Sequence, residues 1–248
     1  TLNKGPGLYK VRDGVHQLRG FDISNITLID GKTGWIVVDA LTSKESSAAA
    51  LAFARKHLGN KPVTALVFTH SHADHFGGAL GVVTPQEVAE RKIPVIASEG
   101  FVEEATSENI LVGTAMARRS MYQFGKNLTP GPKGIVDTGL GKNVSYGAIG
   151  ILEPTQLINK PTQELVLDGV RVVMLGGSPY DETAQIENNA PLRGKNAVMD
   201  RVVGFQKESA AANGWEFVDF SAPMVEIGRR VQAGQPSFSL SMGDRIHP

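Results

Sequence analysis

The chain has 248 residues, with 25 basic and 25 acidic side chains and therefore a formal net charge of zero, and it contains no cysteine. This length can bury one full core or two small ones, and the balanced charge gives no indication of a nucleic-acid partner or a membrane-surface partner. The missing thiols exclude disulfides, cysteine nucleophiles and thiolate metal ligands.

Patterns in residues 1–97 predict one helix, with strands before and after it. Residues 1–8 are rich in Gly and Pro and are expected to form a loose arm. Thr42 and Glu45 predict a capping box at the start of a helix that ends at Gly59. Short apolar runs bounded by turn residues predict strands at residues 15–18, 26–29, 35–38, 63–68 and 93–97.

The strand at 63–68 leads directly into four side chains that suit a metal, namely His70, His72, Asp74 and His75. In an extended loop His70 and His72 point the same way and can reach one metal. Asp74 and His75 follow a turn and can reach a second, and Asp74 is also a candidate catalytic residue. Two metals about 3.5–4 Å apart can share a bridging hydroxide. The alternative is a set of surface histidines in a polar loop.

This H-x-H-x-D-H pattern is the metal motif of the metallo-β-lactamase superfamily, and its flanks resemble the alkylsulfatases of that superfamily, zinc enzymes that hydrolyse dodecyl sulfate and similar detergents. The resemblance runs from about Tyr9 to about Val170. The segments that carry it are Arg19–Ile26, Gly34–Asp39, Phe76–Gly78, Ser107–Asn109 and Arg118–Arg119.

The resemblance implies an α/β fold with a mixed sheet, the incomplete αββα sandwich of a metallo-β-lactamase. It implies two zinc sites, a metal-bound hydroxide, and a role for Asp39 in supporting the histidine loop from behind. Arg118 and Arg119 fall in a predicted helix over residues 101–124, broken near Gly113. Guanidinium groups suit a sulfate ester because they stay charged and donate paired hydrogen bonds, although solvated helix charges are an equal alternative.

Downstream of that helix the pattern changes. Residues 134–150 contain five glycines and predict a flexible loop, and a hairpin is expected around Asp168-Gly169. The alkylsulfatases supply further metal ligands from this part of the chain. Glu187 is a weak candidate for one of them, because its neighbours match the family pattern only in part and at a different spacing.

Residues from about 171 to 248 instead resemble the C-terminal part of SGNH (GDSL-type) esterases, with a helix predicted over about 194–213, its stop at Gly214, and a strand predicted at 216–220. In that family Asp244 and His247 would be the acid and base of a serine triad, although the Gly-Asp-Ser block of the nucleophile is absent here. Residues 1–170 and 171–248 are thus predicted to be two partial domains, the second an α/β segment. A natural fusion, a rearranged gene and a designed chimeric sequence all fit this pattern.

Three functions follow from the sequence. The first is a zinc-dependent hydrolase of alkyl sulfate esters that uses a metal-bound hydroxide. The alternatives are an ester hydrolase that uses Asp244 and His247, and a metal-binding protein without catalysis. The expected partner is a small-molecule sulfate or ester. No apolar run approaches the roughly 20 residues of a spanning helix and no signal peptide is visible, so a soluble protein is expected, its compartment and oligomeric state left open.

Overall fold

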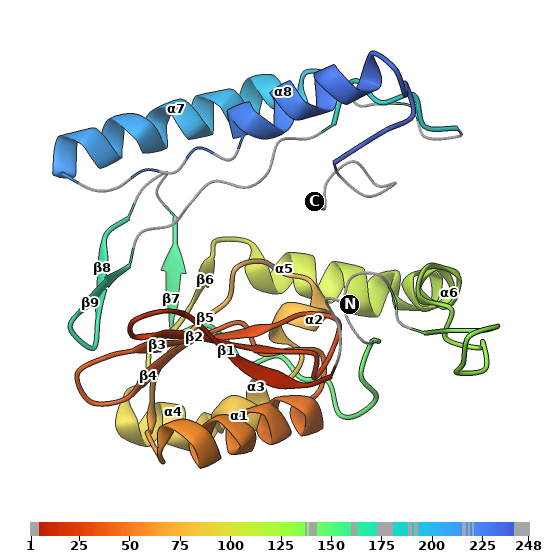
Figure 1. Ribbon diagram of the computed structural model, residues 1–248. Coiled ribbons are helices and arrows are strands. Elements are labelled where there is room, and N and C mark those ends of the chain that lie inside the picture. Colours follow the sequence, from red (N-terminus) through yellow and green to blue (C-terminus); the bar gives the residue numbers. More distant parts are fainter. Residues whose placement is uncertain are drawn as a thin grey trace. The chain divides into compact units, whose positions relative to one another are not determined.

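The chain forms two compact units in the computed structural model (Figure 1). The first comprises Thr1–Asn159 and Leu165–Val172, and the second comprises Lys160–Glu164 and Val173–Pro248. No helix in the part of the chain that the structure describes is long and apolar enough to cross a membrane. The described residues are 5–136, 138, 143–159, 163–172, 181–187, 190, 193–214, 217, 219 and 221–240.

A seven-stranded mixed sheet dominates the first unit, with its strands in sequence order from edge to edge. The first four strands pair antiparallel, and the last three join in parallel. This confirms the predicted mixed sheet. The strands are β1 (Gly7–Arg12), β2 (Val15–Arg19), β3 (Ile26–Asp30), β4 (Trp35–Val38), β5 (Val63–Val67), β6 (Val95–Ser98) and β7 (Gln156–Ile158).

Alternation along the central strands gives the sheet two buried faces. Leu66 of β5 belongs to a core that includes residues of α1 (Lys44–Leu58), α3 (Ala79–Val82) and α4 (Pro85–Arg91), the helices on one side of the sheet in Figure 1. Its neighbour Val67 belongs to a second cluster with Leu167. Because successive strand residues point to opposite faces, one apolar run serves both cores.

The second face is covered by a hairpin of β8 (Leu165–Leu167) and β9 (Val170–Val172). Its turn docks on the turn between β3 and β4, where the Asp168 carboxylate accepts hydrogen bonds from the Thr33 and Gly34 amides at 2.9 and 3.0 Å. The described part of the first unit therefore contains a helical layer, a full sheet and two strands over its other face. This agrees with the predicted incomplete αββα sandwich.

The helix predicted over residues 101–124 is observed in three pieces. These are α5 (Phe101–Thr106), the π-helical segment η1 (Ser107–Leu111) and α6 (Gly113–Phe124). The break near Gly113 is thus confirmed. Phe101 anchors the start of α5, since its ring stacks on Phe68 and meets Phe76 edge-on, with centroids 5.1 and 5.6 Å apart.

Two local predictions were wrong. The N-cap of α1 is Ser43, whose side chain accepts from the Ser46 amide, and the hydroxyl of the buried Thr42 has no partner among the described residues. Glu45 does not complete a capping box there, because its carboxylate accepts from the Ala148 amide. The Gly- and Pro-rich start is an arm only in part, since β1 begins at Gly7.

The second unit contains α7 (Lys195–Asn213) and α8 (Ser221–Gln232). The predicted helix over 194–213 with its stop at Gly214 is confirmed, and Gly214 has a positive φ of 65°. The strand predicted at 216–220 falls largely outside the described residues. The esterase resemblance of this segment and the division into domains stay predictions.

Candidate metal centre

The candidate site lies where two neighbouring parallel strands end. Asp39 follows β4, and the histidine loop follows β5, which pairs in parallel with β4. Parallel strands end at the same edge of a sheet, so these segments meet. Asp39 adopts a left-handed φ of 61°, a conformation that costs a non-glycine residue energy, while its amide donates to the Val67 carbonyl at 2.9 Å.

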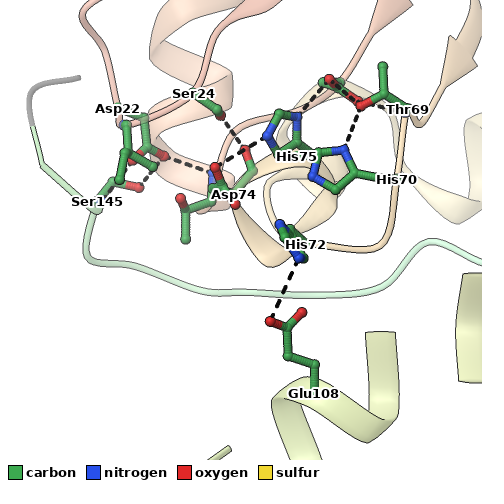
Figure 2. A network of polar contacts seen from close by, with 12 residues as sticks. Asp22, Ser24, Thr69, His70, His72, Asp74, His75, Glu108 and Ser145 are labelled. Atoms are coloured by element: carbon green, nitrogen blue, oxygen red, sulfur yellow. Dashed lines mark hydrogen bonds and ion pairs between the residues drawn. The ribbon is translucent and has the colours of Figure 1, made fainter. Parts of the chain in front are cut away.

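The four predicted ligands are brought together (Figure 2). The ring centroid of His70 lies 4.6 Å from that of His72 and 4.1 Å from that of His75. The Asp74 Oδ2 atom lies 3.3 Å from His75 Nε2. Asp74 and His75 belong to the short helix α2 (Ala73–Phe76), whereas His70 and His72 precede it in the loop.

His75 is held between two carboxylates. Its Nδ1 lies 2.8 Å from Asp39 Oδ2, and its Nε2 faces Asp74. Burial by itself lowers the pKa of His75, but the hydrogen bonds with Asp39 and Asp74 outweigh it and raise the pKa to about 10. For Asp74, burial raises the pKa, and the hydrogen bond and charge of His75 overcome this to lower it. In the metal-free chain His75 is therefore protonated, with its two ring nitrogens facing the carboxylates of Asp39 and Asp74.

His70 is oriented through Thr69. The Thr69 amide and hydroxyl both donate to Asp39 Oδ1, at 2.9 and 3.0 Å, and the same hydroxyl lies 3.0 Å from His70 Nδ1. Because the hydroxyl hydrogen is directed to the carboxylate, the hydroxyl accepts from His70 Nδ1 and leaves Nε2 without a proton. Burial, reinforced by the neighbouring imidazoles of His75 and His72, lowers the pKa of His70 to about 4. A neutral His70 is the form that binds a metal.

Glycines let the histidine loop lie directly against the start of α1. A Cβ atom at Gly78 would collide with the Ser47 side chain and the carbonyls of Ala40 and Ser43. The Gly78 amide donates to the Leu41 carbonyl at 2.9 Å, and the Ala40 amide donates to the His75 carbonyl at 2.7 Å. The close approach therefore requires glycine at this position.

Asp22 holds together chain segments that lie beside the candidate site. This residue is only 1% exposed, and its carboxylate accepts from the Thr42 amide at 2.7 Å and from the Ser145 amide and hydroxyl at 2.9 and 2.8 Å. Two residues later, the Ser24 hydroxyl donates to the Asp74 backbone carbonyl. Asp22 thereby joins the start of α1, the segment around Ser145 and the backbone under Asp74. Sequence reasoning missed this role of Asp22. The signal that could have indicated it was a single acidic residue shortly before the apolar strand at 26–29.

The donor set suits zinc in kind, because it offers imidazole nitrogens and a carboxylate oxygen. Among the described residues, however, no three His, Asp or Glu side chains form a complete group that could hold a metal. The site therefore presents closely spaced pairs of ligands with oriented rings.

The other predicted site residues lie elsewhere or are not described. Arg118 and Arg119 are exposed on α6, and no ion pair joins either to a described residue of the histidine cluster. Glu187 is exposed in the second unit. Asp244 and His247 lie outside the described residues, so the triad hypothesis stays a prediction. Sequence reasoning gave no role to Glu108, whose Oε1 lies 4.0 Å from His72 Nε2.

Comparison with known proteins identifies related sequences. The family model described as the metallo-beta-lactamase superfamily matches residues 19–158. An alkyl/aryl-sulfatase from Saccharomyces cerevisiae is 45% identical over 172 residues, which cover 69% of this chain and 27% of that protein. A linear primary-alkylsulfatase from Pseudomonas sp. is 43% identical over 164 residues, or 66% of this chain and 24% of that protein.

The match extends to a solved structure. A stereoselective inverting sec-alkylsulfatase from Pseudomonas sp. superposes with a TM-score of 0.66 at 42% identity, over 71% of this chain and 28% of that one. The chain thus spans about a quarter of the length of the curated relatives it matches.

We predict that Asp39→Asn lowers the pKa of His75 in chelator-treated protein, measured by NMR titration of the imidazole. The folded pKa of about 10 lies above the ordinary 6.5. Protonated His75 therefore stabilises the metal-free fold fully below pH 6.5, and this contribution is lost as the pH rises towards 10. Asp30→Asn, which removes the partner of Lys61 instead, should leave the titration unchanged. An unaltered pKa in Asp39→Asn would contradict the proposed contact.

A second prediction concerns Asp22. Asp22→Ala leaves the buried Thr42 amide and the partly buried Ser145 amide without an acceptor, so the free energy of unfolding should fall by about 1–3 kcal/mol per unpaired donor. Urea unfolding measures this. Asp13→Ala is the matched control, since its side chain is 95% exposed and should change stability by less than about 0.5 kcal/mol. Equal stability of both variants would argue against the supporting role of Asp22.

Proposed function

The chain belongs to the metallo-β-lactamase superfamily, and from this premise we propose that it acts as a zinc-dependent hydrolase of alkyl sulfate esters. The observation that carries the proposal is the cluster at the end of β5, where His70 and His75 are each held by a hydrogen bond at Nδ1. The alkylsulfatases that match at 43–45% identity support the substrate class.

Membership of the superfamily implies metal use. In the proposal, His70 and His72 hold one zinc ion, and Asp74 and His75 hold the other. Zinc bound by such ligands supplies Lewis acidity and lowers the pKa of bound water to about 7. The chain's part is to keep the donor atoms oriented and to hold His70 in its neutral form.

Asp39 carries most of that orienting work. Its Oδ2 faces His75 Nδ1, and its Oδ1 fixes Thr69, which in turn fixes His70. A carboxylate on the far nitrogen of a ligating imidazole sets the ring orientation and raises the basicity of the ligating nitrogen. One acidic side chain therefore prepares one ligand in each proposed pair.

The segment formed by η1 and α6 carries side chains of the kinds that would bind an alkyl sulfate. Ile110 and Leu111 on η1 are 71% and 80% exposed, and Arg118 and Arg119 follow on α6. An alkyl chain and a sulfate would match apolar side chains and guanidinium groups respectively. We propose this segment as the substrate side of the site, with Glu187 as a candidate for a further metal ligand. A separate proton-transfer role for Asp74 stays a prediction.

Sulfate release from dodecyl sulfate by the zinc-loaded chain tests the proposal. The double variant His70→Ala, His72→Ala should lose this activity to background, because one metal position has no other recognisable ligands. His57→Ala is the control, since this exposed histidine lies on the last turn of α1 and should retain the activity of the unmodified chain.

Two results would contradict the hydrolase. Zinc binding without sulfate release would favour a metal-binding protein without catalysis. Turnover of a p-nitrophenyl ester that survives the double variant and is lost in His247→Ala would favour the esterase alternative.

A further inference from the structure

The third imidazole of the cluster meets a carboxylate from a different part of the chain. His72 Nε2 lies 4.0 Å from Glu108 Oε1, and their side chains are 39% and 28% exposed. Figure 2 shows the Glu108 side chain extending from its helix towards the His72 ring. Glu108 is the second residue of η1, far from the histidine loop in sequence.

The two other imidazoles are oriented differently from His72. His75 meets Asp39 and His70 meets Thr69, and in both the nitrogen concerned is Nδ1. In His72 it is Nε2 that faces an acidic partner. We propose that Glu108 is the positioning residue of His72, holding Nε2 so that a metal is met by Nδ1. This inference rests on the proposed metal site, and it names Glu108 as the residue that orients the third imidazole, that of His72.

The packing of α5 explains why Glu108 lies at this position. Phe101 contacts Phe68 and Phe76, which directly precede and follow the loop from Thr69 to His75. Ala105, one turn later, is fully buried. Glu108 comes three residues after Ala105 and lies near the same face, with the backbone changing from α-helical to π-helical at Ser107 between them. The face that docks on the loop therefore also delivers the carboxylate.

The π-helical backbone adds an independent indication. Helix α5 changes to η1 at Ser107, directly before Glu108. Such π-helical turns are rare and are frequent at functional sites, because the wider turn re-aims the side chains it carries. The Asn109 side chain donates to the Ala105 carbonyl at 2.8 Å across this wider turn.

Glu108 is suited to orientation rather than to holding the fold together. A partly exposed carboxylate–imidazole pair contributes little to folding stability. The separation of 4.0 Å closes to a hydrogen bond through a small rotation of the flexible glutamate side chain. Variants at Glu108 should therefore fold normally and still change the metal site.

Cobalt(II) titration of the full chain tests this role through its visible absorption bands, which report ligand geometry without any turnover. Glu108→Ala should weaken binding of one cobalt ion by roughly 10–100-fold, the usual effect of removing an outer partner of a ligating histidine, and should change the bands. Glu108→Gln should recover part of both effects, because its amide oxygen still accepts from Nε2. Glu104→Ala is the matched control, since this exposed glutamate lies on α5 and its loss removes the same charge.

Three outcomes would overturn the inference, and they separate it from the proposed function. If the unmodified chain binds cobalt and Glu108→Ala binds it with the same affinity and bands, Glu108 does not position His72 and the metal site stands. If Glu104→Ala weakens binding equally, the effect is one of overall charge. If the unmodified chain binds no cobalt, the proposed function falls and this inference with it.

Discussion

The carboxylate of Asp39 joins the end of β4 to the histidine loop that follows β5, and the geometry of the site depends on this contact. It accepts from the Thr69 amide and hydroxyl and meets His75 Nδ1 at 2.8 Å. The residue adopts a left-handed backbone to do so, and the packed sheet edge offsets the cost. Without it the Thr69 amide would lose its acceptor, and two imidazoles would lose the contacts that orient them.

The supporting contacts come from segments far apart in the chain, which explains what the sequence could and could not predict. Strand runs, the helix stop at Gly214 and the ligand motif are local patterns. The structure confirms the strands predicted before residue 98 and the stop, and it brings the four motif side chains together. The role of Asp22 depends on Ser145, 123 residues away, and that of Glu108 on the docking of α5. No local pattern encodes such pairings. The misplaced cap at Thr42 has the same cause in part, because Glu45 pairs with the Ala148 amide, 103 residues away, and Ser43 takes the cap instead.

Each proposed zinc ion has only two recognisable protein ligands. Two protein ligands per zinc fall short of the three that catalytic zinc sites use, so each ion would be held weakly unless further donors join. The chain spans about a quarter of its curated relatives' length. Orientation by Asp39, Thr69 and Glu108 reduces the loss of ring freedom on binding, which raises the affinity that a small ligand set can reach.

Whether the histidine cluster holds zinc is tested by the zinc content of the purified chain, measured by inductively coupled plasma mass spectrometry beside His72→Ala. We expect close to two zinc ions per chain, with the content falling in the variant. Little or no zinc in the unmodified chain would contradict this expectation, since the clustered side chains would then be a remnant of a metal site and the sulfatase proposal would have to be dropped.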